Sequence, residues 1–161
     1  MNVSYQFPVF NPYNKATLEI FISGCRKKCK DCHNPELRDF KFGEPLNILE
    51  LKNMIRIHKD FIKVISFTGG EPLDSNKGLY TLVQELQKEF KDLNLEWWLF
   101  TGKDLDVDSY YYGLFPKEEK KYAWIFNCFD KVKYGHYDST KVKSGFPASS
   151  NQRVWSKESM W

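Results

Sequence analysis

The sequence lacks a secretory signal, and it lacks any apolar run long enough to cross a bilayer. With only four cysteines in 161 residues and no such signal, disulfide bonds are not expected. The 24 basic and 21 acidic residues are spread without a block of either sign, so the net charge of +3 indicates no preference for nucleic acid or membrane surfaces. We therefore expect a cytoplasmic protein that binds neither nucleic acid nor membrane.

The length and composition are typical of one folded domain. Hydrophobic residues make up 42% of the chain and aromatic residues 17%, which is far from the composition of a disordered segment. A chain of this length is also large enough to bury a core. We expect a single domain over residues 1–161.

The most informative motif is a set of three cysteines, Cys25, Cys29 and Cys32, spaced C-x3-C-x2-C. A [4Fe–4S] cube held by four cysteines serves electron transfer, whereas a cube held by three keeps one iron free to bind another molecule. Zinc is the alternative, but a structural zinc site usually has four protein ligands. The fourth cysteine, Cys128, lies far along the chain. His33 directly follows Cys32, so His33 and Cys32 could bind the same ion only with strain. The spacing favours an iron–sulfur cluster and leaves zinc open.

Apolar periodicity predicts strands that alternate with helices. The expected strands are Thr17–Ser23, Lys63–Phe67, Leu95–Phe100 and Lys131–Tyr134. The expected helices are Ile48–Lys59, about Lys77–Phe90, and roughly Lys117–Phe129. This alternation indicates an α/β fold with a mainly parallel sheet and right-handed crossovers. About four such units are too few to close an eight-stranded barrel, so we expect an open partial (βα) barrel with an irregular tail over about residues 139–161.

Each notable motif follows one of the first three predicted strands. The cysteine loop follows the first, Thr68–Pro72 (Thr-Gly-Gly-Glu-Pro) follows the second, and Thr101-Gly102 follows the third. Because the carboxyl ends of parallel strands share one rim, we expect these segments to meet at a ligand site. The glycines would let the backbone approach a ligand closely, although a Gly-Gly turn alone is also typical of an ordinary loop.

The cysteine motif followed by Gly-Gly-Glu-Pro resembles the radical S-adenosylmethionine (SAM) superfamily. Within it, the chain is similar to the activating proteins of anaerobic ribonucleotide reductases. The segments that carry this second resemblance are Phe21–Cys25, His33–Leu37, Phe100–Gly102, Val132–Tyr137 and Ser149–Arg153. Together they cover most of the chain.

The resemblance implies a [4Fe–4S] cluster on Cys25, Cys29 and Cys32, with SAM bound to the fourth iron. It also implies cofactor contacts from a wider set of residues, namely Asp31, Cys32, His33, Gly69, Gly70 and Glu71. In that family an electron from the cluster cleaves SAM to methionine and a 5′-deoxyadenosyl radical, and no further catalytic side chain is implied. The implied substrate is a glycine of the reductase large subunit, and the implied electron donor is a protein such as flavodoxin.

Two other functions stay open at this point. One is another small radical SAM enzyme, such as 7-carboxy-7-deazaguanine synthase, and the other is a zinc-stabilised binding module without catalysis. A protein substrate would need an interface, for which several aromatic residues are candidates. They are Tyr110, Tyr111, Tyr112, Trp155 and Trp161.

Overall fold

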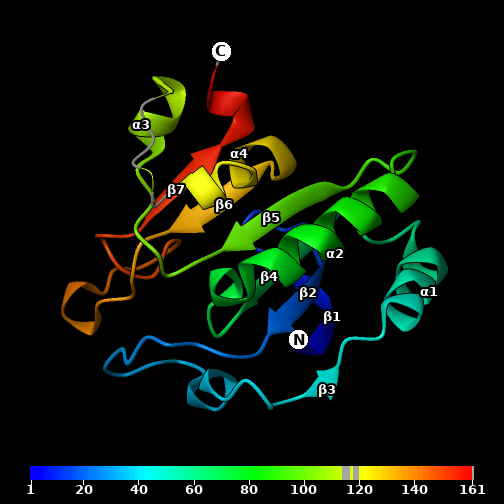
Figure 1. Cartoon of the computed structure of the whole chain (residues 1–161), viewed down its shortest axis with the longest axis horizontal. Coiled ribbons are helices and arrows are strands. Elements are labelled where there is room, and N and C mark those ends of the chain that lie inside the picture. The colour runs from blue at the N-terminus through cyan, green and yellow to red at the C-terminus, as the bar shows by residue number, and fades with distance from the viewer. Residues whose placement is uncertain (114–116, 118–119, 161) are drawn as a thin grey trace.

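The computed structural model describes residues 1–113, 117 and 120–160 as one sheet with helices packed beside it (Figure 1). The strands are β1 (Asn2–Phe10), β2 (Ala16–Ile22), β3 (Glu44–Pro45), β4 (Val64–Gly69), β5 (Glu96–Phe100), β6 (Lys131–Tyr134) and β7 (Arg153–Ser156). The α-helices are α1 (Ile48–His58), α2 (Asn76–Glu89), α3 (Val107–Tyr111) and α4 (Ile125–Cys128). Short 3-10 helices lie at Pro35–Arg38, Pro72–Ser75, Lys120–Tyr122, Ser139–Lys141 and Lys157–Met160.

The sheet is open, and its strand order is β3-β1-β2-β4-β5-β6-β7. The four central strands, β2, β4, β5 and β6, run parallel to one another, as the alternation of strands and helices predicts. The outer strands are antiparallel to their neighbours. The fold is therefore α/β with a parallel centre and antiparallel edges.

Strand β1 was not predicted from the sequence. It forms a hairpin with β2 through a turn in which the Asn11 side chain accepts hydrogen bonds from the Tyr13 and Lys15 amides, each at 3.0 Å. Asn14 takes a left-handed backbone conformation in this turn, with φ of 58°. The hairpin adds an antiparallel strand beside β2. Strand β2 in turn positions the cysteine loop, which begins at its end.

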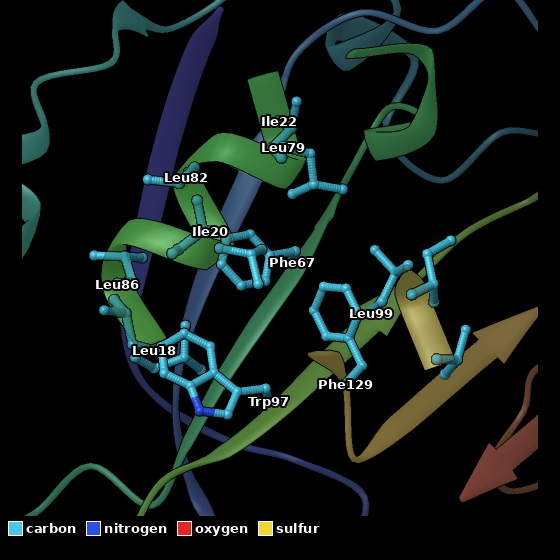
Figure 2. Close-up of a cluster of buried hydrophobic side chains, with 14 of the residues drawn as sticks. Leu18, Ile20, Ile22, Phe67, Leu79, Leu82, Leu86, Trp97, Leu99 and Phe129 are labelled. Atoms are coloured by element: carbon cyan, nitrogen blue, oxygen red, sulfur yellow. The ribbon is translucent and has the colours of Figure 1, made fainter. Parts of the chain in front are cut away.

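The core lies between α2 and one face of the parallel strands. Figure 2 shows Leu79, Leu82 and Leu86 of α2 facing strand residues such as Ile20 and Phe67. These side chains are almost fully removed from water. The alternating residues of each strand consequently point to the opposite face of the sheet, where the site described below is found.

The predicted helix over Lys117–Phe129 is wrong in most of its described part. The chain there forms only the 3-10 helix Lys120–Tyr122 and the four-residue α4. The spacing of its apolar residues suggested one helical stripe, but in the structure these residues pack in several directions. Trp124 contacts Tyr80 of α2, while Phe126 contacts Trp155 of β7.

The predicted irregular tail, 139–161, also contains a strand. Strand β7 pairs with β6 along four residues, and its Trp155 is 5% exposed. The tail is therefore part of the sheet and of the core. No helix in the part of the chain that the structure describes is both long and apolar enough to cross a membrane.

Candidate functional site

A pocket of about 270 Å³ lies where the carboxyl ends of the parallel strands meet. Its walls come from five segments: the cysteine loop, the turn after β4, the end of β5, strand β6 and the C-terminal segment. The predicted convergence of the three motifs on one rim is confirmed. The lining residues are Cys25, Lys27, Cys29, Cys32, His33, Asn34, Arg38, Thr68, Gly69, Gly70, Glu71, Phe100, Thr101, Gly102, Lys133, Tyr137, Phe146, Ala148 and Gln152.

The cysteine loop is closed at its base by two backbone hydrogen bonds. The Gly24 amide donates to the Leu37 carbonyl at 2.8 Å, and the Cys25 amide donates to the Arg38 carbonyl at 3.1 Å. Higher in the loop, the Arg38 guanidinium donates to the Cys29 carbonyl. The loop thus has a fixed base on the sheet and an internal brace between its two sides.

All three cysteines of the motif line the pocket, and none is in a disulfide. Among the residues that the structure describes, no three His, Cys, Asp or Glu side chains come together as ligands of a single metal ion would. Three thiols around one pocket are the number that would bind three irons of a four-iron cube and leave the fourth iron open. Burial raises the pKa of the Cys25 thiol, and the carboxylates of Glu71 and Asp74 act in the same direction.

The two glycines after β4 let that strand end lie directly against the cysteine loop. Gly69 has φ of +123°, a conformation that favours glycine. A Cβ on Gly70 would lie 2.4 Å from the Leu37 carbonyl oxygen and 2.6 Å from the Gly24 carbonyl oxygen. Both neighbours are backbone atoms at the base of the loop. The Gly-Gly turn is therefore required for packing as well as for an open pocket wall.

Glu71 joins the turn after β4 to the end of β5. Its side chain is 1% exposed, and its Oε1 accepts hydrogen bonds from the Thr101 hydroxyl at 2.6 Å and the Leu73 amide at 3.0 Å. Its Oε2 accepts from the Gly102 amide at 2.8 Å. The carboxylate lines the pocket, but its hydrogen-bonding capacity serves the protein itself.

Asp74 forms a second connection between the site segments. Its carboxylate accepts a hydrogen bond from the Arg26 amide in the cysteine loop at 2.8 Å, and from the Lys103 ammonium after β5 at 2.9 Å. Although burial opposes ionisation, these donors hold the pKa of Asp74 below its usual value. Glu71 and Asp74 together fix the three strand ends relative to one another.

The structure places five of the six predicted cofactor contacts on the pocket and one outside it. Cys32, His33, Gly69, Gly70 and Glu71 line the pocket. Asp31 does not: it is exposed in a turn and has φ of 54°. The left-handed turn explains why an aspartate stands before Cys32, because aspartate tolerates this backbone conformation better than most residues.

The C-terminal segment supplies a wall of the pocket that the sequence analysis did not assign. Gln152, 7% exposed, donates to the Gly135 carbonyl at 3.2 Å and accepts from the Ser149 amide at 3.3 Å. These bonds hold the segment that carries Tyr137 and Phe146 into the site. The Tyr137 ring packs on the ring of His33 at 4.5 Å between centroids. The sequence did hold a sign of this wall, because Ser149–Arg153 is one of the segments that carry the family resemblance, although no role was assigned to it.

Three cationic side chains line the pocket, and two of them are engaged by the protein. Lys27 donates to the Gly102 carbonyl, and Arg38 donates to the cysteine loop. Lys133 of β6 is the third, and burial lowers its pKa to about 8, with Lys27 acting in the same direction and Glu71 opposing it. From the sequence alone Lys133 was given no role in the site, although Val132–Tyr137 is one of the segments that carry the resemblance.

The aromatic residues expected at a protein interface differ in exposure. Tyr112 is 77% exposed and fits the expectation, whereas Tyr110 is partly buried against Phe126. Trp155 is buried in the core, so its assignment to a surface was wrong. The side chain of Tyr111 and the whole of Trp161 lie outside the described residues.

Comparisons with known proteins point to one family. A family model described as a 4Fe-4S single cluster domain matches residues 16–155. A protein of Enterobacteria phage T4 is 24% identical over 147 residues, which is 88% of this chain and 85% of that protein. Relatives from Vibrio cholerae and Escherichia coli K12 are each 30% identical, covering 72% and 66% of this chain and 78% and 71% of their own lengths. All three relatives are named anaerobic ribonucleoside-triphosphate reductase-activating protein.

Proposed function

Because the chain belongs to the family of anaerobic ribonucleoside-triphosphate reductase-activating proteins, we propose that it generates a glycyl radical on such a reductase by reductive cleavage of SAM at a [4Fe–4S] cluster. The observation that carries the proposal is the meeting of the three-cysteine loop and the Gly-Gly turn around one pocket. The loop offers three thiols, which leaves one iron of a cube for a further ligand.

The residues present fit both cofactors. Cys25, Cys29 and Cys32 would hold the cluster, which when bound supplies the electron for cleavage of SAM. The backbone of Gly69 and Gly70 would lie along the methionine part of SAM, and Cys32 and His33 would border it from the cysteine loop.

Glu71 would contribute to this site through position rather than direct hydrogen bonding. Since its carboxylate oxygens are taken by Thr101, Leu73 and Gly102, it fixes the wall against which SAM would lie. The protein thus supplies a shaped pocket and excludes water from part of it, while the cofactors supply the chemistry.

We further propose that the open sheet is a partial (βα) barrel and that residues 1–161 fold as one domain. The consecutive parallel order β2-β4-β5-β6 supports the barrel assignment, because each strand follows its neighbour through a crossover connection. An incomplete barrel has an open side through which a loop of another protein could reach the pocket.

The proposed partners are the large subunit of an anaerobic ribonucleoside-triphosphate reductase and an electron donor such as flavodoxin. Exposed Arg26, Lys28 and Lys30 beside the cysteines offer a basic surface for an acidic donor. We place the protein in the cytoplasm, where thiols stay reduced, and its four free cysteines support that location.

The proposal is tested by anaerobic reconstitution with iron and sulfide, followed by reduction in the presence of SAM and the reductase from the same source. We expect SAM cleavage and an electron paramagnetic resonance doublet from a glycyl radical, absent when the reductase's C-terminal glycine is replaced by alanine. A colourless protein that retains zinc would support the binding-module alternative. SAM cleavage without any radical on the reductase would contradict the proposed substrate and leave another radical SAM reaction.

A further inference from the structure

The face of the sheet opposite the core, which we call the open face, carries a second row of residues next to those that line the pocket. Glu19 of β2 pairs with Ser66 of β4, and Ser66 pairs with Trp98 of β5. Thr68 and Phe100 lie two residues further along these strands, so they are on the same face, and both line the pocket. At about 3.3 Å per residue, the row that contains Glu19 is roughly 7 Å from the row at the pocket.

The carboxylate of Glu19 has no partner within the protein. In the part of the chain that the structure describes, it makes no hydrogen bond and no ion pair. Burial raises the pKa of this carboxyl, and no described cation or hydrogen-bond donor acts against the rise. The neighbouring Ser66 is 1% exposed, and its hydroxyl also lacks a hydrogen-bond partner among the described residues. Two adjacent polar groups are thus left unsatisfied at one height of the open face, which is rare for buried groups.

A second glutamate on the same face shows the contrast. Glu96 lies two residues before Trp98 on β5. Its carboxylate accepts a hydrogen bond from the Trp98 indole N–H at 3.1 Å and pairs with the Lys15 ammonium. Although burial opposes ionisation, these contacts hold the pKa of Glu96 below its usual value. Glu96 is therefore satisfied within the protein, whereas Glu19 is not.

An aromatic ring covers the open face over β5, while the face over β2 is partly exposed. The Tyr13 ring packs edge-on against Trp98 at 5.3 Å between centroids. On β2, both Glu19 and Phe21 are partly exposed. Phe21 pairs with Thr68, which lines the pocket. The exposed strip along β2 is consequently continuous with the pocket.

We propose that Glu19 binds the segment of the reductase that carries the substrate glycine, by accepting hydrogen bonds from main-chain amides of that segment. The inference rests on the proposed function, in which the glycine reaches the pocket. An extended chain advances about 3.3 Å per residue, so an amide two residues from the glycine would lie at the height of Glu19. Each main-chain N–H that leaves water needs an acceptor, and a carboxylate offers two acceptor oxygens and no donor.

The unpaired state of Glu19 in the free protein suits a group that is used only in a complex. A carboxylate that is already paired, as that of Glu96 is with Lys15, would have to leave its partner before it could accept from a substrate. Hydrogen bonds to a charged acceptor are also stronger than those between neutral groups. Glu19 can therefore fix the position of the segment along β2, and through it the position of the glycine at the pocket.

The test is the rate of glycyl-radical formation on the reductase large subunit, followed by electron paramagnetic resonance with the reconstituted, reduced protein and SAM. We expect Glu19→Leu to raise the KM for the reductase about tenfold. Iron content, SAM affinity and SAM cleavage without the reductase should stay as in the wild type. Because the Glu19 carboxylate has no described partner, the variant should unfold at the same or a higher temperature. Glu44→Leu, at an exposed position of β3, is the matched control and should change none of these quantities.

Reductase variants separate amide recognition from recognition of a basic side chain. Each lysine or arginine near the substrate glycine is replaced by alanine in turn, and the effect of Glu19→Leu is measured with each variant. We expect the same factor in KM throughout, because these replacements leave the main chain intact. A factor that disappears with one of them would show that Glu19 pairs with that side chain, and the assignment to amides would be wrong.

An unchanged KM in Glu19→Leu would overturn the proposal. A lower unfolding temperature or a weaker SAM affinity would overturn it too, since either would indicate a structural role for Glu19. Failure of the proposed function has a different signature: wild-type protein that cleaves SAM but forms no radical on the reductase would overturn both. A wild type that forms the radical, together with an equally active Glu19→Leu variant, would overturn the role of Glu19 alone.

Discussion

The Thr101 hydroxyl donates a hydrogen bond of 2.6 Å to the buried carboxylate of Glu71, and this bond joins the ends of two neighbouring parallel strands. The same carboxylate accepts from the Gly102 amide at 2.8 Å. Glu71 was predicted as a cofactor contact, and the structure shows how it can shape the pocket without giving up its oxygens to a ligand.

Glu71→Gln should therefore destabilise the protein. An amide keeps one acceptor oxygen and turns its NH2 toward the Gly102 amide, which leaves two donors facing each other in a buried place. We expect a loss of about 2–3 kcal/mol in the free energy of unfolding, measured by denaturant titration. The control is Glu50→Gln on the exposed side of α1, for which the change should stay within about 0.5 kcal/mol. Equal stability of the two variants would contradict the role given to Glu71.

Replacing Gly70 with valine should reduce iron incorporation as well as SAM affinity. The added side chain would meet the Gly24 and Leu37 carbonyls, so the base of the cysteine loop would have to move. Iron and sulfide content after reconstitution measures the effect. Gly102→Ala provides the comparison, because its nearest contact would be the Glu71 carboxylate at 3.4 Å, and its iron content should remain near normal. Full iron loading in Gly70→Val would show that the loop tolerates the displacement.

Loss of any one cysteine of the motif should abolish the cluster. Cys25→Ala, Cys29→Ala and Cys32→Ala each leave two thiols, which is too few to hold a cube, so the broad visible absorption and SAM cleavage should disappear together. Cys128→Ala should keep the cluster absorption and SAM cleavage, because Cys128 does not line the pocket. Its sulfur instead accepts a hydrogen bond from the Gln84 side chain at 3.1 Å. A stable cluster in Cys29→Ala would refute the ligand assignment.

The stability of the cofactor-free protein should depend on Lys133 and on pH. Below pH 8 this lysine is protonated in both the folded and unfolded states, and burying its charge costs stability. Between about pH 8 and 10.5 the unfolded state binds more protons, so the contribution of Lys133 to the free energy of unfolding rises with pH. Lys133→Met should be more stable than the wild type by about 1–3 kcal/mol at pH 7, and the difference should shrink toward pH 10. The charges that act on this ammonium, Glu71 and Lys27, are the same in both proteins, so a pH-independent difference would contradict the assignment.

Gln152→Ala should weaken SAM binding by loosening the C-terminal wall of the pocket. The variant loses the bonds to the Gly135 carbonyl and the Ser149 amide, which hold the segment bearing Phe146. We expect a several-fold lower affinity in calorimetry and a stability loss of about 1–3 kcal/mol. Arg153→Ala, at an exposed position next in sequence, should change neither quantity. Deleting residues 149–161 is a poorer test, because it removes β7 and the buried Trp155 and should unfold the protein.

Much of the parallel centre of the sheet could be predicted from the sequence, because a buried strand is easily recognised as a short apolar run that ends at or near a glycine. The predicted strand Leu95–Phe100 differs from β5 by one residue, and the predicted helix Ile48–Lys59 differs from α1 by one. Strand β1 was missed although Val3, Tyr5 and Phe7 alternate with polar residues in it. Its pairing with β2 depends on the Asn11 turn.

The candidate site was predictable to the extent that it follows strands. The cysteines and the Gly-Gly turn were found because parallel topology places such segments on one rim. The pocket wall built by Tyr137, Phe146 and Gln152 was not predicted, because it depends on the path of the C-terminal segment after β6. Lys133 could have been noticed as a charged residue alternating with the buried Val132.

From the closed base of the cysteine loop we expect the protein to mature in two stages. Because the Gly24–Leu37 and Cys25–Arg38 backbone bonds and the core beneath them need no inorganic partner, the sheet can form first. The residues between them can then rearrange around iron and sulfide without disturbing β2. A cluster lost to oxygen could accordingly be rebuilt on the same polypeptide, so that repair needs no new synthesis of the chain.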